Sequence, residues 1–341
     1  MLRNKATRIL LTVGIILTVC FFAPAKSFAQ VKWINVSADY APLPSSVQVF
    51  KTNDPLDGKP FIAYYVKAKL KDKKLDFTVD TTLGRRLTPS KFYEKNGKPL
   101  LVVNTTFFSF ETNQSLNVVI MDGKEVGYNI HSIPMKGKDT FQYRHPFGSA
   151  IGISKKRNAD VAWLYTDSSM KYPYATQTAK QAVKDSVDHF PVDSIKNRYY
   201  SWVHTTKQIP QFEKWKMRTA VGGGPVLIQG GRVEISNNEE LKFGGKAIND
   251  MHPRTCMGYT NDGYLIIMVI QGRFPGLAEG ATLTQEAKLL QELGCVEALN
   301  LDGGGSSSML VNGKETITPS GKDGGRGEQR PVPAVFIIKN N

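Results

Sequence analysis

The sequence predicts an α+β fold with a largely antiparallel or mixed β-sheet core and few flanking helices. Short runs rich in β-branched and aromatic residues recur along the chain, and tight-turn dipeptides such as Asp122-Gly123 and Asn312-Gly313 separate several of them. Such dipeptides supply the positive φ angles that two-residue hairpin loops require, so neighbouring strands are expected to pair antiparallel. The predicted strands cover residues 61–70, 100–104, 118–121, 161–165, 226–228, 265–270, 296–301 and 334–338.

Two segments are predicted to be helical, residues 282–293 and residues 176–189. The first has clear boundaries. Thr282 and Gln285 have the spacing of a capping box, and Gly294 can take the left-handed conformation that ends a helix. Helices are too few for alternating βαβ units, which supports the α+β class.

Glu286 lies on the apolar side of the first predicted helix, three residues after Leu283 and four before Leu290. Its carboxylate is therefore expected to point inward. A buried carboxylate is costly unless it has a partner. Glu286 is thus either the structural partner of a cation, which is the safer interpretation, or an acid/base residue with a shifted pKa.

Residues 1–29 have the order of a secretory signal peptide, with three cations ahead of an apolar stretch over residues 9–23 and then Ser27-Phe28-Ala29 before the expected cleavage site. The apolar stretch is shorter than the roughly 20 residues of a membrane-spanning helix, which favours cleavage over a membrane anchor. Lipid attachment at Cys20 is disfavoured because bulky residues precede it. The mature protein is therefore expected to be exported, to the periplasm, the cell surface or the medium, without a stable membrane span.

Cleavage would leave residues 30–341, which we expect to form a single domain. Residues 170–215 are rich in aromatic and charged residues and are predicted to be an insertion over the active site. Aromatic side chains in such a segment suit sugar rings, but most are expected to pack the insertion onto the domain.

The chain is basic, with a formal net charge of +14, and the signal peptide accounts for four of its cations. A basic protein attracts anionic partners, here phosphorylated carbohydrates or an anionic envelope glycan. Nucleic acid is not an expected partner, because no basic helix, zinc-finger spacing or aromatic nucleic-acid motif accompanies the charge.

The mature chain keeps two cysteines, Cys256 and Cys295. An oxidising compartment permits a disulfide between them, but two buried thiols on apolar strands are the favoured interpretation. Without a CxxC motif, thiol chemistry and cysteine-bound zinc have little support.

Three consecutive glycines, Gly303, Gly304 and Gly305, interrupt a strand directly after Asp302. Glycine loses more backbone entropy on folding than other residues, so such a run indicates close approach of the backbone to another group or left-handed conformations. The amides could form an anion-binding nest, with the Ser306 hydroxyl beside it and phosphate as the guest. The alternative is a glycine-rich bulge or turn that Asp302 caps.

Two arginines, Arg254 and Arg273, bracket one predicted hairpin, each at an end of a strand, and both are expected to face one rim of the sheet. A guanidinium group suits phosphate because it is planar and stays charged. Isolated arginines at strand ends are, however, usually solvated. Gly224 belongs to a second glycine run before a strand, which is again either a turn or a site of close approach.

The segment Asn300-Leu301-Asp302-Gly303-Gly304-Gly305-Ser306-Ser307 resembles the signature of the phosphodiester glycosidases, the family of the mannose 6-phosphate uncovering enzyme. The similarity covers most of residues 100–341. Its other matching segments are Gly223-Gly224-Pro225-Val226-Leu227, His252-Pro253-Arg254-Thr255, Gly272-Arg273, Thr282-Leu283-Thr284-Gln285-Glu286-Ala287 and Arg330-Pro331-Val332.

The resemblance implies an α+β hydrolase that cleaves a sugar from a sugar 1-phosphodiester. Asp302 is the first candidate for the catalytic carboxylate and Glu286 the second. Arginines would hold the departing phosphate. We assign the remaining expected site residues to phosphate binding or to orientation of sugar hydroxyls and carboxylates: Arg254, Arg273, Gly303, Gly304, Gly305, Ser306, Gly224, Asn104 and Asn300. No cofactor is required, although a divalent cation such as calcium near Asp302 is compatible with the residues.

The sequence departs from the family pattern in two places. Thr105 and Thr106 stand where the family has two glycines, in an element that otherwise reads Asn-Gly-Gly-Phe-Phe, and Gln271 stands where an aspartate is common. These differences keep a second function open, a non-catalytic binding module for anionic polysaccharide. A metal-dependent phosphodiesterase is disfavoured because the five histidines are scattered along the chain.

Overall fold

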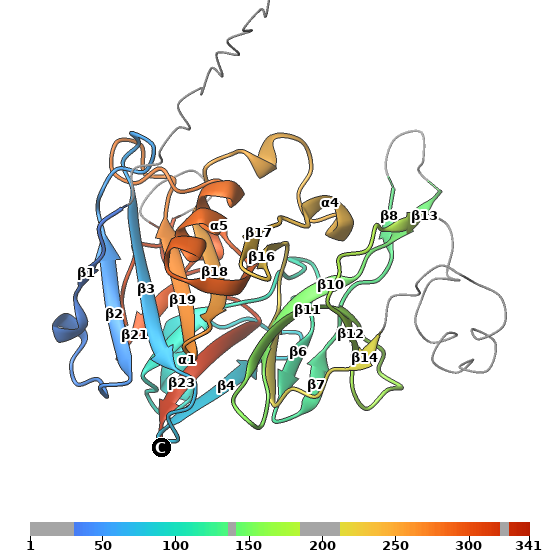
Figure 1. Cartoon of the computed structure of the whole chain (residues 1–341), viewed down its shortest axis with the longest axis horizontal. Helices are drawn as coiled ribbons and strands as arrows, with labels where there is room; N and C mark the ends of the chain where they lie inside the picture. The colour runs from blue at the N-terminus through green and yellow to red at the C-terminus, as the bar shows by residue number, and fades with distance from the viewer. Residues whose placement is uncertain (1–30, 136–140, 185–211, 321–326) are drawn as a thin grey trace, which may run out of the picture.

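The computed structural model of the chain describes residues 31–135, 141–184, 212–320 and 327–341. In these residues, three large β-sheets pack around a common core, and the helices lie outside them (Figure 1). Every strand pair in this part of the chain is antiparallel. The predicted α+β class with a β-rich core is confirmed.

The largest sheet has eight strands, three from residues 34–69 and five from residues 226–300. Its strands, in spatial order, are β1 (Ile34–Asn35), β2 (Val47–Thr52), β3 (Ile62–Lys69), β19 (Tyr264–Gln271), β18 (Arg254–Thr260), β20 (Cys295–Asn300), β16 (Val226–Gln229) and β17 (Arg232–Val233).

The second sheet has seven strands and forms the right-hand part of the molecule in Figure 1. Its strands are β14 (Glu213–Lys214), β12 (Tyr174–Thr176), β11 (Ala159–Tyr165), β10 (Gly148–Ile153), β15 (Thr219–Gly222), β6 (Val119–Met121) and β7 (Lys124–Gly127). A small sheet beside it consists of β13 (Val183–Lys184), β9 (Tyr143–His145) and β8 (Ile133–Pro134).

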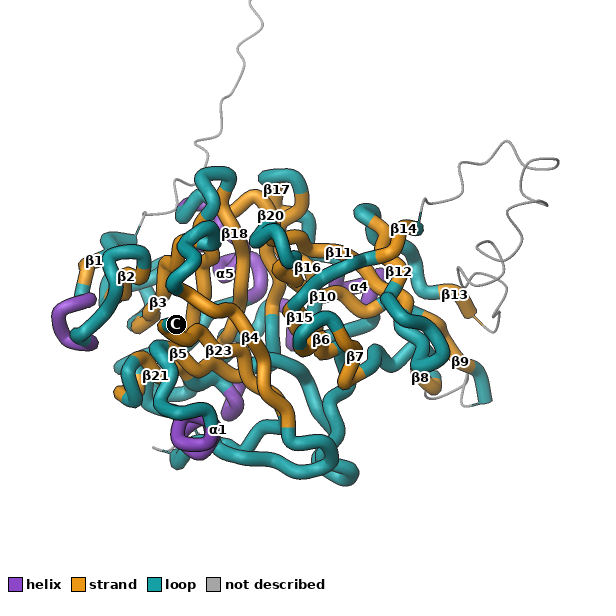
Figure 2. Tube along the Cα trace, turned by 90° about the horizontal axis from the view of Figure 1, so that it is seen from below, coloured by secondary structure: helices purple, strands orange, loops and turns teal. Residues whose placement is uncertain are grey.

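The third large sheet has five strands and lies at the base of the molecule, close to the first helix (Figure 2). Its strands are β22 (Lys314–Glu315), β21 (Met309–Val311), β5 (Leu101–Asn104), β23 (Ala334–Asn340) and β4 (Leu75–Thr81).

The α-helices of the described residues are α1 (Pro89–Lys95), α4 (Asn237–Glu240) and α5 (Leu283–Glu292), and the 3₁₀ turns are η1 (Ser37–Tyr40), η3 (Gly245–Ile248) and η4 (Gly304–Ser306). Helix α5 begins and ends as predicted, with a complete capping box between Thr282 and Gln285 and with Gly294 at a φ of 82°. The predicted helix over residues 176–189 is wrong where the structure describes it, because this stretch holds the end of β12 and the short strand β13. The pairing of β12 with β11 and of β13 with β9 outweighs the weak helical pattern of this stretch.

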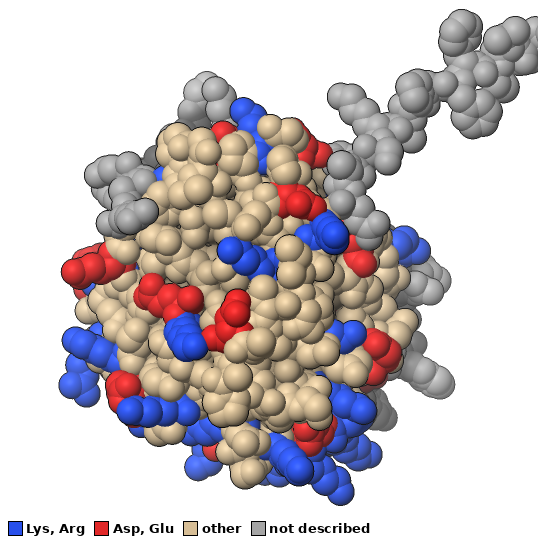
Figure 3. Space-filling view, turned by 90° about the vertical axis from the view of Figure 1, so that its left-hand side faces the viewer, with Lys and Arg blue, Asp and Glu red and all other residues tan. Residues whose placement is uncertain are grey.

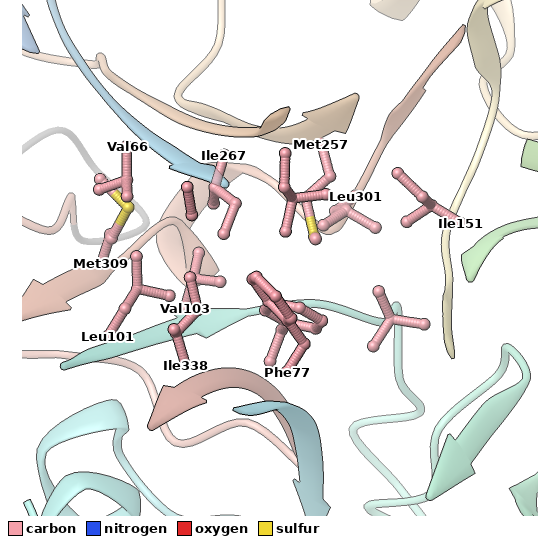
Figure 4. Packing of buried hydrophobic residues seen from close by; sticks show 14 of the residues in the cluster. Val66, Phe77, Leu101, Val103, Ile151, Met257, Ile267, Leu301, Met309 and Ile338 are labelled. Carbon is pink, nitrogen blue, oxygen red and sulfur yellow. The ribbon is translucent and has the colours of Figure 1, made fainter. Parts of the chain in front are cut away.

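The eight-stranded sheet is buried on both faces. Along β19, Ile267 packs toward the five-stranded sheet, while its neighbours Ile266 and Met268 face α5. Because successive side chains of a strand point to opposite faces, this explains the unbroken apolar run of β19. Figure 4 shows the inner layer, in which Ile267 and Met257 lie opposite Leu101 and other residues of the five-stranded sheet.

The two cysteines are buried free thiols, which confirms the favoured interpretation. Cys256 lies opposite Asn300 in the β18–β20 ladder, and Cys295 lies opposite Thr260. Four residues of strand, roughly 13 Å at about 3.3 Å per residue, therefore separate the two positions, and a disulfide needs Cα atoms within about 7 Å.

The predicted signal peptide lies outside the described residues, and so do residues 185–211 of the predicted insertion. The two ends of that insertion join the seven-stranded sheet, where β12 pairs with β14. Among the described residues, no helix has the length and apolar character needed to cross a membrane. On the face shown in Figure 3, cationic and acidic side chains are interspersed, with Lys and Arg gathering along the lower edge.

Candidate active site

The predicted site residues lie where the three large sheets meet. Strand β20 of the eight-stranded sheet ends at Asn300, and the chain crosses through residues 301–308 to β21 of the five-stranded sheet. Strand β5 of the five-stranded sheet ends beside this crossing at Asn104. From the seven-stranded sheet, β15 ends at Gly222 and leads through Gly224 into β16.

Asn104 holds the crossing loop in place. Its Nδ2 donates to the main-chain carbonyl of Asp302 at 2.6 Å, while its Oδ1 accepts from the Thr255 hydroxyl at 2.9 Å and from the Ser308 amide at 3.0 Å. The side chain is fully buried. Of the two roles expected for Asn104, its contacts fit the orientation of a carboxylate, since it holds the main chain of Asp302, and its full burial disfavours contact with a sugar hydroxyl.

Asn300 has a related role toward the second glycine run. Its Nδ2 donates to the carbonyl of Gly224 at 2.7 Å, and the Gly224 amide donates to the Asn300 carbonyl at 2.7 Å. Gly224 has a φ of 119°, and an added Cβ would overlap the side chains of Glu240 and Lys242. This glycine is thus a site of close approach. The buried Oδ1 of Asn300 has no hydrogen-bond partner among the described residues.

Each of the three consecutive glycines lies against a different neighbour. A Cβ on Gly303 would lie 2.7 Å from the carbonyl oxygen of Pro253, and a Cβ on Gly304, whose φ is 60°, would lie 3.0 Å from Nη2 of Arg273. A Cβ on Gly305 would overlap the guanidinium of Arg330. The predicted close approach is therefore confirmed, and two of the three groups approached are arginine side chains.

The predicted nest of free amides is largely wrong, because the crossing loop uses most of its amides internally. The Gly304 amide donates to Pro253 at 2.8 Å, and the amides of Ser306 and Ser307 donate to carbonyls within the 3₁₀ turn at 3.2 Å. Positive charge at this loop therefore comes from side chains more than from the backbone.

Asp302 is half-buried at the start of this loop. Its carboxylate accepts from the Ser306 hydroxyl and from the Gly303 amide, and Ser306 in turn accepts from Nη1 of Arg330 at 3.2 Å. Burial raises the pKa of Asp302 to about 7, although the Ser306 hydroxyl, the charge of Arg330 and the Gly303 amide all oppose the rise. A pKa near 7 suits Asp302 to the role of a general base at neutral pH.

Two guanidinium groups, those of Arg273 and Arg330, flank the crossing loop. Burial lowers the pKa of Arg273, and the neighbouring charge of Arg330 lowers it further. Neither arginine forms an ion pair with an acidic side chain of the described residues. Two unpaired cations that repel each other across a glycine loop form a site for an anion such as phosphate.

Arg330 is a site residue that the sequence analysis did not select. In the sequence it belongs to the segment Arg330-Pro331-Val332, one of those that match the family. Arg330 lies 28 positions after Asp302 in the sequence, and no local pattern joins the two. Only the return of β23 between β4 and β5 brings it to the loop.

Arg254 does not share the exposure of Arg273. It is buried, and its Nε and Nη2 donate to the main-chain carbonyls of Ala281 and Asp250 at 2.9 Å and 3.1 Å. Its charge nevertheless acts on Arg273 and on Glu286. Arg254 therefore contributes positive potential from beneath the site and braces the loop that carries residue 281.

Glu286 is sealed in the core between α5 and the eight-stranded sheet. Burial raises its pKa to about 7, while the charge of Arg254 and the Cys256 thiol act in the opposite direction. Neither carboxylate oxygen forms a hydrogen bond to a nitrogen or oxygen donor of the described residues. The inward orientation is confirmed, but the role as second catalytic carboxylate is wrong because no substrate atom can reach a fully buried group.

His252 lies within range of the charges of Arg254 and Arg273. Burial lowers its pKa, and the charges of Arg254 and Arg273 lower it further, so the imidazole is neutral at pH 7. Its buried Nδ1 has no hydrogen-bond partner among the described residues. A neutral imidazole can accept or donate a hydrogen bond to a bound hydroxyl group.

A pocket of about 460 Å³ opens beside Gly224 and Arg254, since its lining residue Lys242 lies against Gly224 and the Arg254 guanidinium lies 5.8 Å from the ring centroid of its lining residue Phe243. Phe107, Lys242 and Phe243 are among its lining residues, with the two phenylalanine rings 5.9 Å apart. Lys242 Nζ lies 5.6 Å from the Phe107 ring centroid, and its aliphatic chain touches Gly224. Burial lowers the pKa of Lys242, opposed by the charge of Glu240. Aromatic faces next to a polar cation suit a sugar ring with hydroxyl groups.

Thr105 and Gln271, two of the three positions that depart from the family pattern, make structural hydrogen bonds in this chain. Thr105 accepts the Asp302 amide at its carbonyl at 2.7 Å and donates its hydroxyl to Ala334 at 3.2 Å. The buried Thr106 hydroxyl has no partner among the described residues. Gln271 is buried, and its Oε1 accepts from the Thr318 amide at 2.9 Å.

The surroundings of Asp302 do not fit calcium. Calcium takes six to eight oxygen ligands, often from several carboxylates, whereas Asp302 is a single carboxylate with the cation Arg330 as a neighbour. Among the described residues, no three His, Cys, Asp or Glu side chains gather at a potential metal site.

The family model described as phosphodiester glycosidase matches residues 97–339, which include the crossing loop, Arg273, Arg330 and β5. The chain belongs to the phosphodiester glycosidase family. This confirms the resemblance identified from the sequence.

Individual relatives share less of the chain. The mouse N-acetylglucosamine-1-phosphodiester alpha-N-acetylglucosaminidase is 30% identical over 106 residues, which are 31% of this chain and 20% of that protein, and the human protein is 28% identical over a stretch of the same length. The matched stretch is thus about a fifth of the length of these curated relatives.

The solved catalytic domain of the zebrafish N-acetylglucosamine-1-phosphodiester alpha-N-acetylglucosaminidase has a TM-score of 0.54 at 19% identity, over 92% of this chain and 89% of that one. A hypothetical protein from Synechocystis has a TM-score of 0.55 at 15% identity, over 86% and 62% of the two chains. At such identities these two structures establish the fold.

Proposed function

We propose that this chain is an exported hydrolase that cleaves a sugar from a sugar 1-phosphodiester in an envelope or extracellular glycan. The observation that carries the proposal is the juxtaposition of one titratable carboxylate, Asp302, with the unpaired guanidinium groups of Arg273 and Arg330 on a glycine loop. The family to which the chain belongs supports the reaction class. Export rests on the predicted signal peptide.

In the proposed reaction, the bond between the anomeric carbon and the bridging oxygen breaks. Ionised Asp302 acts as nucleophile or as general base toward water, and the bridging oxygen leaves with the phosphate. A phosphodiester is already a good leaving group, so protonation of the departing oxygen matters less than stabilisation of its charge. Arg273 and Arg330 supply that stabilisation in a site that is partly shielded from water.

The sugar is proposed to occupy the pocket lined by Phe107, Lys242 and Phe243, and the phosphate to lie on the arginine side of Asp302. This orientation places the anomeric carbon between the aromatic pocket and the cations. His252, neutral on the same rim, is available to a hydroxyl of the substrate.

The test is hydrolysis of a panel of sugar 1-phosphodiesters in ¹⁸O-labelled water. Incorporation of the label into the sugar is the expected result. Label in the phosphate product would show P–O cleavage and overturn the proposed bond. Binding without turnover would instead identify the chain as a non-catalytic binding module for anionic polysaccharide.

The matched variant is Asp302→Asn, which removes the charge and preserves the size of the side chain. Loss of a catalytic carboxylate is expected to lower kcat by about 10³-fold or more. Near-normal phosphate binding by the same variant would show that the loop is still folded. Full activity of Asp302→Asn would exclude Asp302 from the chemical step.

A further inference from the structure

An exposed aromatic ring connects the proposed active site to a second group of cations. Phe110 has 63% of its surface exposed, and its ring packs at a tilt of 47° against the buried Phe108, with centroids 4.8 Å apart. The guanidinium of Arg330 lies 5.4 Å from the centroid of the Phe110 ring, and the guanidinium of Arg86 lies 5.3 Å from the same centroid. The Phe110 ring therefore contacts both Arg330, which flanks the crossing loop, and Arg86, which comes from a distant part of the chain.

Arg86 has no anionic partner among the described residues. It forms neither an ion pair nor a side-chain hydrogen bond with any residue that the structure describes, and its contacts are the faces of Phe108 and Phe110. Contact with aromatic rings restrains a guanidinium group without neutralising it. Arg86 is half-buried and thus held in place with its donors unused.

The cationic surface continues beyond Arg86. A pocket of about 420 Å³ is lined by Arg85, Arg86 and Lys95, together with threonine and leucine side chains. Lys95 is paired with Asp80 at 2.8 Å, but Arg85, like Arg86, has no ion-pair partner among the described residues. Unpaired guanidinium groups thus extend from the crossing loop, through Arg330 and Arg86, to this pocket.

A small sugar phosphodiester would not use this surface. It carries one negative charge, which Arg273 and Arg330 are placed to bind. Three features lie outside the immediate site, namely the exposed ring of Phe110 and the unpaired charges of Arg86 and Arg85. The aromatic ring suits a further sugar ring, and the guanidinium groups suit a further phosphate. Since Arg330 is on the side of the departing phosphate, these features lie where the remainder of the substrate would continue.

We propose that Arg86, Phe110 and the pocket beside Arg85 form a second subsite, which binds the next repeat of a glycan whose sugars are joined through phosphodiester links. Phe110 stacks on the sugar of that repeat, and Arg86 binds its phosphate. The identity of the substrate as a repeating polymer rests on the proposed function, but binding at the second subsite does not require turnover.

The experiment uses synthetic sugar 1-phosphodiester oligomers with one, two or three phosphodiester links. Affinity is measured by calorimetry and kcat/KM by release of sugar, for the wild type, Arg86→Gln and Phe110→Ala. The wild type is expected to bind the three-link oligomer at least about tenfold more tightly than the one-link compound, since each added charge-assisted contact contributes on this scale. Arg86→Gln is expected to remove most of that gain and to leave the one-link values unchanged.

The control is Arg232→Gln, because Arg232 is an exposed arginine on β17 that is already paired with Glu234. It removes the same charge far from the subsite and is expected to alter neither substrate series. Thermal unfolding of Arg86→Gln and Phe110→Ala shows whether the surface is otherwise intact.

The outcomes separate this inference from the proposed function. Equal affinity of the wild type for one-link and three-link compounds would overturn the second subsite, and so would an equal effect of Arg86→Gln on both. If no compound is hydrolysed but Arg86→Gln still selectively weakens binding of the three-link oligomer, the proposed reaction fails while the subsite stands. A parallel titration with inorganic triphosphate tests charge alone. If triphosphate binds as tightly as the three-link oligomer, and if Arg86→Gln weakens the binding of both to the same extent, the role of the sugar on Phe110 is overturned.

Discussion

The guanidinium of Arg330 lies directly against the main chain of Gly305, so closely that a Cβ at position 305 would overlap it. From this position Arg330 donates to the Ser306 hydroxyl, which in turn donates to Asp302. The absence of a side chain at residue 305 therefore determines where Arg330, the cation that we propose to bind phosphate, lies relative to the carboxylate.

Gly305→Ala is expected to displace Arg330 and to lower kcat/KM by about 10- to 100-fold, with a loss of about 1–3 kcal/mol in the free energy of unfolding from overpacking against the carbonyl of Ser320. Steady-state kinetics and urea unfolding measure the two effects. Gly244→Ala is the matched control, since a Cβ there would meet nothing within 4 Å and its φ is not in the left-handed region. Equal kinetics for both alanine variants would contradict the proposed role of Gly305.

Arg330→Gln is expected to change the pH dependence as well as the affinity. Arg330 opposes the rise in the pKa of Asp302, so its removal raises that pKa further above about 7. If ionised Asp302 is the base or nucleophile, kcat/KM of the wild type rises as pH increases through about 7, and the same rise in Arg330→Gln lies at higher pH.

The measurement is kcat/KM from pH 5 to pH 9 for the wild type, Arg330→Gln and Arg232→Gln. Arg232 is far from Asp302 and provides the control for loss of a cation. A kcat/KM that falls as pH rises through about 7, with the fall at higher pH in Arg330→Gln, would show that protonated Asp302 is the active form. An unmoved profile would show that the two side chains do not interact in the working enzyme.

Much of the fold was predictable because local patterns agree with the final packing. The run of β19 and the capping box of α5 each determine one element, and dipeptides such as Asn312-Gly313 determine the hairpins through their positive φ. The helix predicted over residues 176–189 failed because its pattern was weak and strand partners from β11 and β9 were not visible in the sequence.

The site was only half predictable. The glycine run indicated close approach, but the sequence contains no signal for what approaches, and the guanidinium groups of Arg273 and Arg330 come from different sheets. Likewise, the asparagines are polar residues beside a motif, which suggested substrate contact. Burial shows instead that Asn104 uses its side chain to hold the loop.

Asn104→Ala tests that positioning role. The substitution leaves the Thr255 hydroxyl, the Ser308 amide and the Asp302 carbonyl without their partner, at an expected cost of about 2–4 kcal/mol in the free energy of unfolding. It is also expected to lower kcat by about 10²-fold at temperatures where the variant is folded, because Asp302 loses its fixed position.

The control for Asn104→Ala is Asn312→Gly at the turn between β21 and β22. Asn312 donates to the carbonyls of Tyr40 and Pro42 at 2.8 Å and 2.7 Å, and glycine accepts its φ of 46°. This control is expected to lose stability and keep kcat. Unchanged kcat in the folded Asn104→Ala variant would show that Asp302 needs no support from this side chain.

Glu286→Gln is expected to alter the pH dependence of stability without a direct effect on chemistry. The pKa of Glu286 is raised by burial from 4.5 to about 7 in the folded protein, so between these values the folded state binds more protons than the unfolded state. The stability associated with protonated Glu286 is fully present below pH 4.5 and is lost as pH rises toward 7, at about 1.4 kcal/mol per pH unit. Glutamine remains neutral throughout.

The difference in the free energy of unfolding between Glu286→Gln and the wild type is therefore expected to rise in favour of the variant from pH 4.5 to pH 7 and to level off above. Urea unfolding at successive pH values measures it, and taking the difference cancels the contribution of Asp302, which titrates in both proteins. Glu94→Gln, an exposed residue of α1 whose partner is Lys98, should show no such trend. A difference that falls with rising pH would mean that Glu286 is buried as a charged partner of Arg254. In that case the neutral carboxyl group, which we infer from its burial and from the lack of hydrogen-bond partners for its oxygens among the described residues, would be wrong.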